Sequence, residues 1–210
     1  MLTSLPAAFG VAALSLFPII NPIGNLPAFF ALTAGDAPAA RRRQAVRTAI
    51  YVTLLLTVFT VAGKALLHAL GISLPALQVA GGLVVGHSAY GMVTAGPKLS
   101  PDEHAAGVAA ADVSFSPMAM PLLSGPGAIG SVIALASRSS GAAPIGGIVL
   151  ADIVLGVVVA AVLALGGPLL SRMGETGVAA LTRIFGFLIL AIAVELMAHG
   201  ILALAPGLTH

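Results

Sequence analysis

Six long apolar runs alternate with short polar segments along the chain. A helix needs about 20 apolar residues to cross roughly 30 Å of hydrocarbon, so we predict an all-α membrane protein with six transmembrane helices. No basic residues precede the first run, and we therefore expect it to be retained as a span and not cleaved as a signal peptide. The predicted spans are Leu5–Thr33, Val46–Leu70, Leu74–Val93, Pro117–Ser137, Ile145–Leu165 and Ile184–Leu204.

The first predicted span contains residues that break helices. A continuous helix over it would be roughly 43 Å long at 1.5 Å per residue, which exceeds the hydrocarbon thickness. Pro18, Pro22 and Pro27 remove backbone N–H donors in a medium that has no water to replace the lost hydrogen bonds. Asn21 and Asn25 can replace some of these bonds, and either one can cap the start of a second half-helix. Both alternatives place polar backbone inside the membrane.

The fourth predicted span has a break at a matching place. In the run Ser124-Gly125-Pro126-Gly127, the glycines weaken a continuous helix, and Ser124 or Gly125 can cap a helix that starts at Pro126. Two interrupted spans at corresponding places indicate a substrate site near the membrane midplane, because half-helix N-termini present free N–H groups and a positive dipole end. An anion, or the carboxylate of a zwitterion, suits such a site. The alternative is that the prolines only kink helices for packing.

The two halves of the chain resemble one another. A shift of 104 positions aligns them without a gap. Since each half has three spans, an odd number, the second copy must be inverted in the membrane relative to the first. We expect one membrane domain in which residues 1–96 and 114–210 are two inverted three-helix repeats, joined by a cytoplasmic linker at 97–113. Matched pairs include Pro22 and Pro126, Gly63 and Gly167, Gly82 and Gly186, and Ala89 and Ala193.

Composition and charge agree with a membrane location. Hydrophobic residues make up 59% of the 210 residues and charged residues only 8%, too few to cover a soluble fold. Arg41, Arg42, Arg43 and Arg47 lie between two apolar runs, where basic residues indicate a cytoplasmic loop and not nucleic-acid binding. Most other Lys and Arg residues follow spans three and five, so both termini are predicted on the non-cytoplasmic side. The chain has no cysteine, and we predict no metal site and no cofactor.

Three of the ionisable residues inside the predicted spans are candidates for ion coupling. Glu195 is near the middle of span six, Asp152 is in span five and His87 is in span three. Charged groups at that depth are costly, so such residues commonly face a cavity and mark ion pathways; each is a candidate for ion coupling or, alternatively, a neutral group hydrogen-bonded in the packing. Outside the spans, we expect Asp112 to cap a helix, and Ser116, which precedes a proline, to be the N-cap of span four.

Two motifs carry a resemblance to a known family. The segments "NPIGNLPAFFALT" and "SPMAMPLLSGPGAI" resemble the signature segments of the MarC family of inner-membrane proteins, and the similarity in spans and loops extends over nearly the whole chain. The resemblance implies a multi-pass inner-membrane protein, similar to archaeal transporters of small neutral amino acids such as glycine and alanine. In the MarC family the sixth span usually carries a glutamine where this chain has Glu195, and this difference leaves the identity of the coupling ion, Na⁺ or H⁺, open. With Ser124 added from the break, the residues expected to bind substrate are Asn21, Pro22, Gly24, Asn25, Ser124, Gly125, Pro126 and Gly127.

The favoured function is therefore ion-coupled secondary transport of a small zwitterionic or neutral solute across the lipid bilayer by alternating access. The motifs HExxH and GxxxxGKS, and a nucleophile elbow, do not occur, so we do not expect an enzyme. The alternatives are an exporter of other small metabolites or drugs and a channel. An intramembrane enzyme is a less favoured alternative. The oligomeric state is left open.

Overall fold

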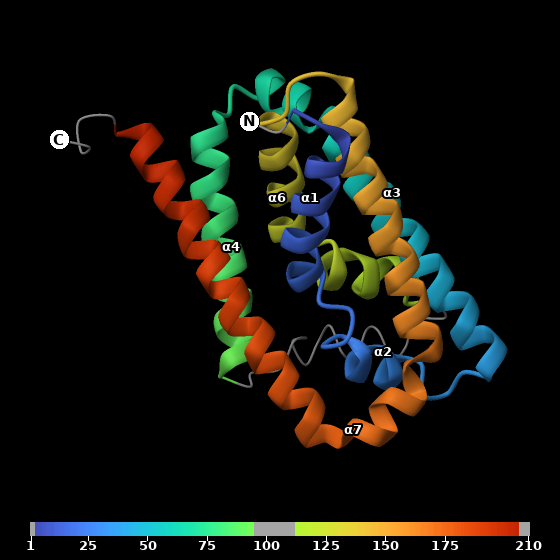
Figure 1. The fold of residues 1–210 in the computed structure, drawn as a ribbon. Coiled ribbons are helices and arrows are strands. Elements are labelled where there is room, and N and C mark those ends of the chain that lie inside the picture. The colour runs from blue at the N-terminus through green and yellow to red at the C-terminus, as the bar shows by residue number, and fades with distance from the viewer. Residues whose placement is uncertain (1–2, 95–111, 206–210) are drawn as a thin grey trace.

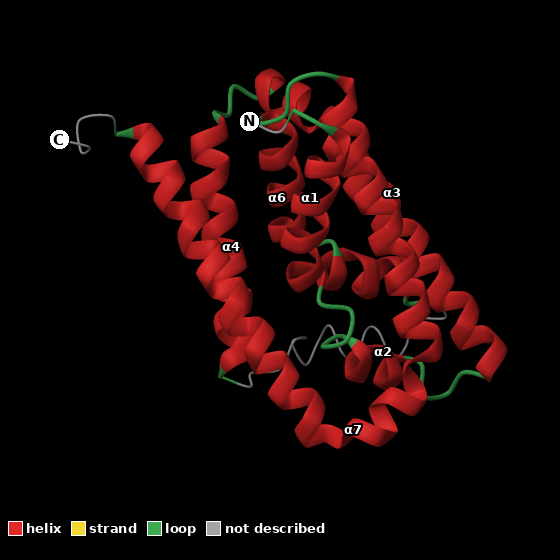
Figure 2. Cartoon of the chain, in the orientation of Figure 1, coloured by secondary structure: helices red, strands yellow, loops and turns green. Residues whose placement is uncertain are grey.

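The structure is a computed structural model that describes residues 3–94 and 112–205, and its elements are helices (Figures 1 and 2). The predicted linker 97–113 therefore lies almost entirely outside the described residues. The helices are α1 (Leu5–Ile20), α2 (Leu26–Leu32), α3 (Pro38–Ala69), α4 (Leu74–Val93), the π-helix η1 (Ser114–Leu123), α6 (Pro126–Ser137) and α7 (Ala142–Leu204).

Each predicted span coincides with a helix, with a broken pair of helices or with one arm of α7. By length and apolarity, three helical segments of the described chain qualify as membrane spans: α3, the α7 arm Ala142–Gly174 and the α7 arm Thr176–Leu204. The pair η1 and α6, bent by 61°, makes a fourth if it is taken as one span. The all-helical membrane class is confirmed, whereas six spans arranged as an inverted repeat stay a prediction.

The fifth and sixth predicted spans form one helix that folds back on itself. α7 is continuous over 63 residues except at Gly174, whose φ of 62° and ψ of 177° are not helical. Glycine tolerates positive φ because it has no Cβ. The two arms of α7 meet at this residue. The bend between the arms lies at the end of the molecule where α2 also lies (Figure 1).

The start of the fourth predicted span differs from expectation. η1 begins at Ser114, and Ser116 lies inside it with φ −119° and ψ 127°, so the prediction that Ser116 is the N-cap was wrong. A residue before proline is driven towards extended backbone by the proline ring, which explains this conformation. The N-cap residue of η1 is instead Val113, and no side chain makes a capping hydrogen bond. The predicted capping role of Asp112 is not borne out: its carboxylate accepts hydrogen bonds from the backbone N–H and the hydroxyl of Ser114, but Asp112 lies one residue before the N-cap position.

Helices that are half a chain apart pack against each other. α1 contacts α6, α3 contacts the first arm of α7, and α4 contacts the second arm. Glycines permit the closest approaches: a Cβ on Gly82 would lie 2.8 Å from the carbonyl oxygen of Ala193, and one on Gly186 would lie 3.1 Å from that of Ala89. Large apolar side chains also remain exposed around the bundle, among them Leu14, Val61, Val157 and Phe187. An apolar exterior of this kind is what lipid contact requires.

Candidate substrate-binding cavity

The break in the first span is built by two asparagines. Asn21 ends α1 in the left-handed conformation, with φ 44°, which asparagine tolerates better than most residues. Its Oδ1 accepts a hydrogen bond from the N–H of Gly24 at 3.0 Å. Asn25 Nδ2 donates to the carbonyl oxygens of Ile20 and Asn21, both at 3.1 Å. The asparagine side chains thus replace backbone hydrogen bonds that the broken helix loses.

Of the two possible starts for the second half-helix, the structure has the one after Asn25. α2 begins at Leu26 with Asn25 as its N-cap residue, but the Asn25 side chain bonds backwards to the end of α1 and not to α2. α2 has only 7 residues, and so few aligned peptide dipoles give the helix only a small net dipole. α2 therefore offers a ligand only a weak positive end.

The break in the fourth span leaves the start of α6 uncapped by any described side chain. Gly125 is the N-cap residue, in extended conformation, and Pro126 is the first helical residue. Because the first N–H groups of a helix have no partner within it, Gly127 and Ala128 present free backbone donors. Ser124, the other predicted cap, is fully buried and its Oγ has no hydrogen-bond partner among the described residues. α6 has 12 residues and offers the stronger positive end.

Three glycines of the predicted site are required by close packing. A Cβ on Gly24 would lie 2.3 Å from Asn21 Nδ2, one on Gly125 would lie 2.4 Å from the carbonyl oxygen of Pro121, and one on Gly127 would lie 2.4 Å from a methyl group of Val85. Each distance is shorter than a van der Waals contact, so a side chain at any of these positions would displace its neighbour.

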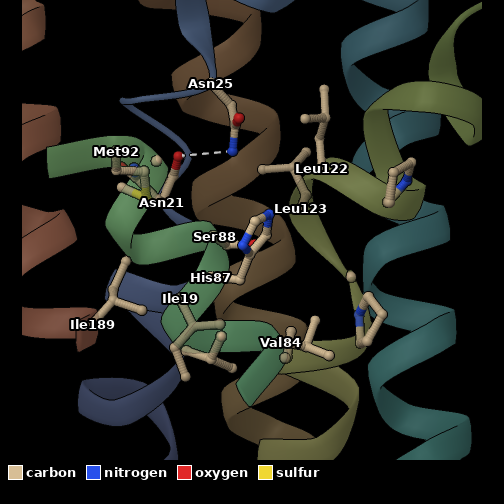
Figure 3. Close-up of a pocket in the computed structure, with 17 residues that line it drawn as sticks. Ile19, Asn21, Asn25, Val84, His87, Ser88, Met92, Leu122, Leu123 and Ile189 are labelled. Carbon is tan, nitrogen blue, oxygen red and sulfur yellow. Dashed lines mark hydrogen bonds between the residues drawn. The ribbon is translucent and has the colours of Figure 1, made fainter. Parts of the chain in front are cut away.

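Both breaks line one cavity of about 290 Å³, shown in Figure 3. Asn21 and Asn25 come from the first break, and the start of α6 comes from the second. α4 closes the cavity and adds the polar side chains of His87 and Ser88. Asn21 is only 2% exposed, and its Nδ2 has no hydrogen-bond partner among the described residues. The cavity is thus apolar, with a small set of polar groups that includes a buried donor. The predicted site residues that line it are Asn21, Asn25, Gly125, Pro126 and Gly127, whereas Pro22, Gly24 and Ser124 are buried behind it.

Comparison with known proteins agrees with this architecture. A family model described as "MarC family integral membrane protein" matches residues 7–205. The chain belongs to the MarC family. It is 33% identical over 207 residues to the UPF0056 membrane protein YvbG of Bacillus subtilis, covering 93% of this chain and 95% of that protein. It is 31% identical over 208 residues to the UPF0056 inner membrane protein MarC of Salmonella typhimurium, covering 93% and 94%. A UPF0056 membrane protein of Pyrococcus abyssi is 33% identical over 196 residues, covering 92% and 94%. No solved structure matches.

The MarC-family motifs identified from the sequence are the segments that form the two breaks. Membership and the apolar helices together make the chain a multi-pass integral membrane protein.

The three candidates for ion coupling lie in different places in this MarC-family fold. His87 lines the cavity. Asp152 is fully buried between α7 and α3, where its Oδ2 accepts a hydrogen bond from Thr60 at 2.8 Å and its Oδ1 has no partner among the described residues. Glu195 has a 72% exposed side chain, next to His199 on the same helix, and lines a second groove. The sequence identified the three residues but not this separation.

Sequence reasoning missed the polar contacts that connect the broken helices to the start of α3. Gln44 Nε2 donates to Asp36 at 2.6 Å, while its Oε1 accepts from the N–H of Val113 at 2.8 Å. Arg47 pairs with Asp112. These partners are up to 69 positions apart, so no local pattern could have revealed them. Gln44 and Arg47, which lie in and beside the basic segment interpreted only as a topology signal, therefore also join the loop after α2 to the chain just before η1.

Asp112, the acidic partner in the contact with Arg47, lies outside the predicted spans. Partial desolvation raises the pKa of Asp112, but the hydrogen bonds from Ser114 and from Arg47 outweigh it, and the pKa lies below its ordinary value of 3.8. Asp112 is therefore charged at neutral pH, as its ion pair with Arg47 requires.

Proposed function

We propose that this chain is a secondary transporter of small neutral amino acids, glycine- or alanine-like, that works by alternating access and is coupled to H⁺ or Na⁺. The observation that carries the proposal is that two helix breaks about 100 positions apart line one cavity. Asn21, which lines it, has a buried amide donor with no hydrogen-bond partner among the described residues. Interrupted helices in the two halves of a chain are the usual pointer to a transporter substrate site.

The polar groups of the cavity suit a zwitterion. In this proposal the substrate carboxylate accepts hydrogen bonds from Asn21 Nδ2 and from the N–H groups of Gly127 and Ala128 at the positive end of α6. The Ser88 hydroxyl and the His87 ring are available as acceptors for the amino group. The volume of about 290 Å³ is at the lower limit of ordinary ligand pockets, which favours a small solute.

Packing between α4 and the second arm of α7 supports the inverted repeat. The contact of Gly82 with Ala193 and the contact of Gly186 with Ala89 are related by the 104-residue shift found in the sequence. Reciprocal contacts of this kind, in which residue i meets j' and j meets i', are typical of an interface with two-fold symmetry. Rocking of one half against the other about such an axis is the motion that alternating access needs.

Asp152 is the favoured site of ion coupling in the proposal. A buried carboxyl with one unpartnered oxygen either carries a proton or binds a cation, since an isolated charge there is costly. His87 and Glu195 remain the other candidates. By analogy with the relative named an inner membrane protein, we place the chain in the inner membrane, with both termini on the non-cytoplasmic side because of the basic segments after spans one, three and five.

The proposal is tested by counterflow in proteoliposomes that are loaded with unlabelled glycine or alanine and supplied with labelled tracer outside. A carrier accumulates tracer transiently, whereas a channel only equilibrates it. Asn21→Asp keeps an oxygen for the Gly24 N–H but replaces the free donor with a negative charge. Because a hydrogen bond to a charged group contributes about 1.5–3 kcal/mol, we expect KM to rise by about ten- to a hundredfold.

Leu14→Ala is the matched control, since Leu14 is 79% exposed on α1 and does not line the cavity. It should transport like the intact chain. An unchanged KM in Asn21→Asp would remove Asn21 from the site. An absence of counterflow for every small amino acid would refute the substrate class, and equilibration without accumulation would favour a channel.

A further inference from the structure

A second groove, of about 400 Å³, lies between α1, α6 and the second arm of α7. Its walls are mainly apolar, with Ser15 on α1 and Ser131 on α6 as small polar groups. Ser131 is only 4% exposed, and its Oγ has no hydrogen-bond partner among the described residues. Arg138, Glu195 and His199 add charged or titratable groups to the lining. The buried hydroxyl of Ser131, the half-buried hydroxyl of Ser15 and groups of both charge signs could contact a small zwitterion, as the polar groups of the first cavity could.

The second groove is related to the cavity by the internal repeat. Its wall on α7 uses the positions that lie 104 residues after the cavity wall on α4. These corresponding pairs are His87 and Ala191, Ser88 and Ile192, Gly91 and Glu195, and Met92 and Leu196. The chemistry of the pairs has diverged, but the same helix face is used in both halves.

The two spaces lie towards opposite ends of the molecule. α4 lines the cavity with residues 84–92, near the end of this helix that lies towards α2, whereas α7 lines the groove with residues 191–199, near its far end. Figure 1 shows these two helix ends on opposite sides of the fold. Ile19 of α1, just before the break, lines both spaces.

We propose that the groove is the opposite half of a single solute path and that the Ile19 side chain is the barrier between the two halves. This inference rests on the proposed transport function and deepens it. Ile19 is half-buried and apolar, and a hydrophobic side chain closes a narrow path by excluding water and polar solutes. Its position two residues before Asn21 places the barrier about half a helical turn from the carboxylate site, where a change at the break would move it.

The test uses the absence of cysteine from the chain, so that a single introduced thiol is the sole reactive one. Ser88→Cys reports on the cavity and Ser15→Cys on the groove; both are near-isosteric. The probe is a charged, membrane-impermeant methanethiosulfonate reagent, added to one side of sealed proteoliposomes of known orientation and then to the other. Labelling needs no substrate. We expect the two thiols to react from opposite sides, and modification of either one to abolish counterflow.

Ile19→Ala, combined with each cysteine, tests the barrier. Removing the side chain should open the path, so that each thiol loses its sidedness and reacts from both sides. Leu14→Ala is the control for a truncation on the same helix that lines neither space, and it should preserve the sidedness. Correctly folded protein is verified by the melting temperature of each variant.

The outcomes separate this inference from the proposed function. Labelling of both thiols from the same side, or sidedness unchanged in Ile19→Ala, overturns the inference even if counterflow by the intact chain establishes a carrier. Opposite sidedness that is lost in Ile19→Ala supports the path and barrier even if no amino acid shows counterflow, in which case the proposed substrate class is the part that fails.

Discussion

The contact between α4 and the second arm of α7 gives a prediction whose size follows from the structure. A Cβ at Gly82 would lie 2.5 Å from Met197 Cγ and 2.8 Å from the carbonyl oxygen of Ala193. The second of these atoms is backbone, so Gly82→Ala must push the two helices apart. At the repeat-related Gly186, a Cβ would lie 2.8 Å from the Met92 Cβ.

The expected cost follows from overpacking. An extra methyl group in a close-packed contact destabilises by about 1–3 kcal/mol. Replacing glycine by alanine in a helix also brings a favourable propensity of about 1 kcal/mol. The effect is therefore measured against Gly10→Ala, because a Cβ at Gly10 of α1 meets nothing within 4 Å. For a chain of this size, we expect Gly82→Ala to melt about 2–12 °C below Gly10→Ala.

The assay is thermal unfolding of the purified protein in one detergent, at a fixed scan rate. Gly86→Ala provides a graded control, since its Cβ would be 3.6 Å from that of Ala193, an ordinary contact, and should differ little from Gly10→Ala. Gly186→Ala should lower the melting temperature like Gly82→Ala if the two-fold relation holds. Equal melting temperatures for Gly82→Ala and Gly10→Ala would refute the packing described for this helix pair.

Two further predictions concern buried and surface carboxylates. Thr60→Val removes the hydrogen bond to Asp152 and should lower stability by about 0.5–2 kcal/mol in thermal unfolding. The control is Thr53→Val, which loses only a hydrogen bond to its own helix and should have a smaller effect. Equal effects of the two changes would count against the Thr60 contact. Because the folded-state pKa of Asp112 lies below 3.8, its stabilising contribution is present above that pH and is lost as the pH falls through the folded pKa. The melting temperature of Asp112→Asn should therefore lie below that of the intact chain at pH 7, by an amount that corresponds to less than about 1 kcal/mol because the pair with Arg47 is exposed. This difference in melting temperature should shrink below about pH 4. A difference that widens in acid would contradict the assigned pKa.

The sequence by itself determined the helical class, the membrane location and the two breaks. These features follow from local chemistry: apolar runs of span length have few alternatives in a bilayer, and prolines with flanking glycines interrupt a helix wherever they occur. It also offered two starts for the second half-helix, of which the structure has the one after Asn25, without a capping bond from its side chain. The family resemblance was confirmed. The local pattern failed at Ser116, where the backbone before proline is extended and the N-cap residue of the helix lies upstream at Val113.

The tertiary structure decided which of these features meet. The packing of α4 beside both breaks placed His87 and Ser88 in the cavity. The packing of α3 against the first arm of α7 joined Asp152 to Thr60, away from Glu195, and the packing of α3 against η1 joined Gln44 to the N–H of Val113. Such contacts connect positions far apart in the chain, and they depend on how closely the helices approach and at what rotation about their axes. Hydrophobic periodicity carries little of that information in a membrane protein, because lipid-facing and buried faces are both apolar; small residues and sparse polar side chains set the packing instead.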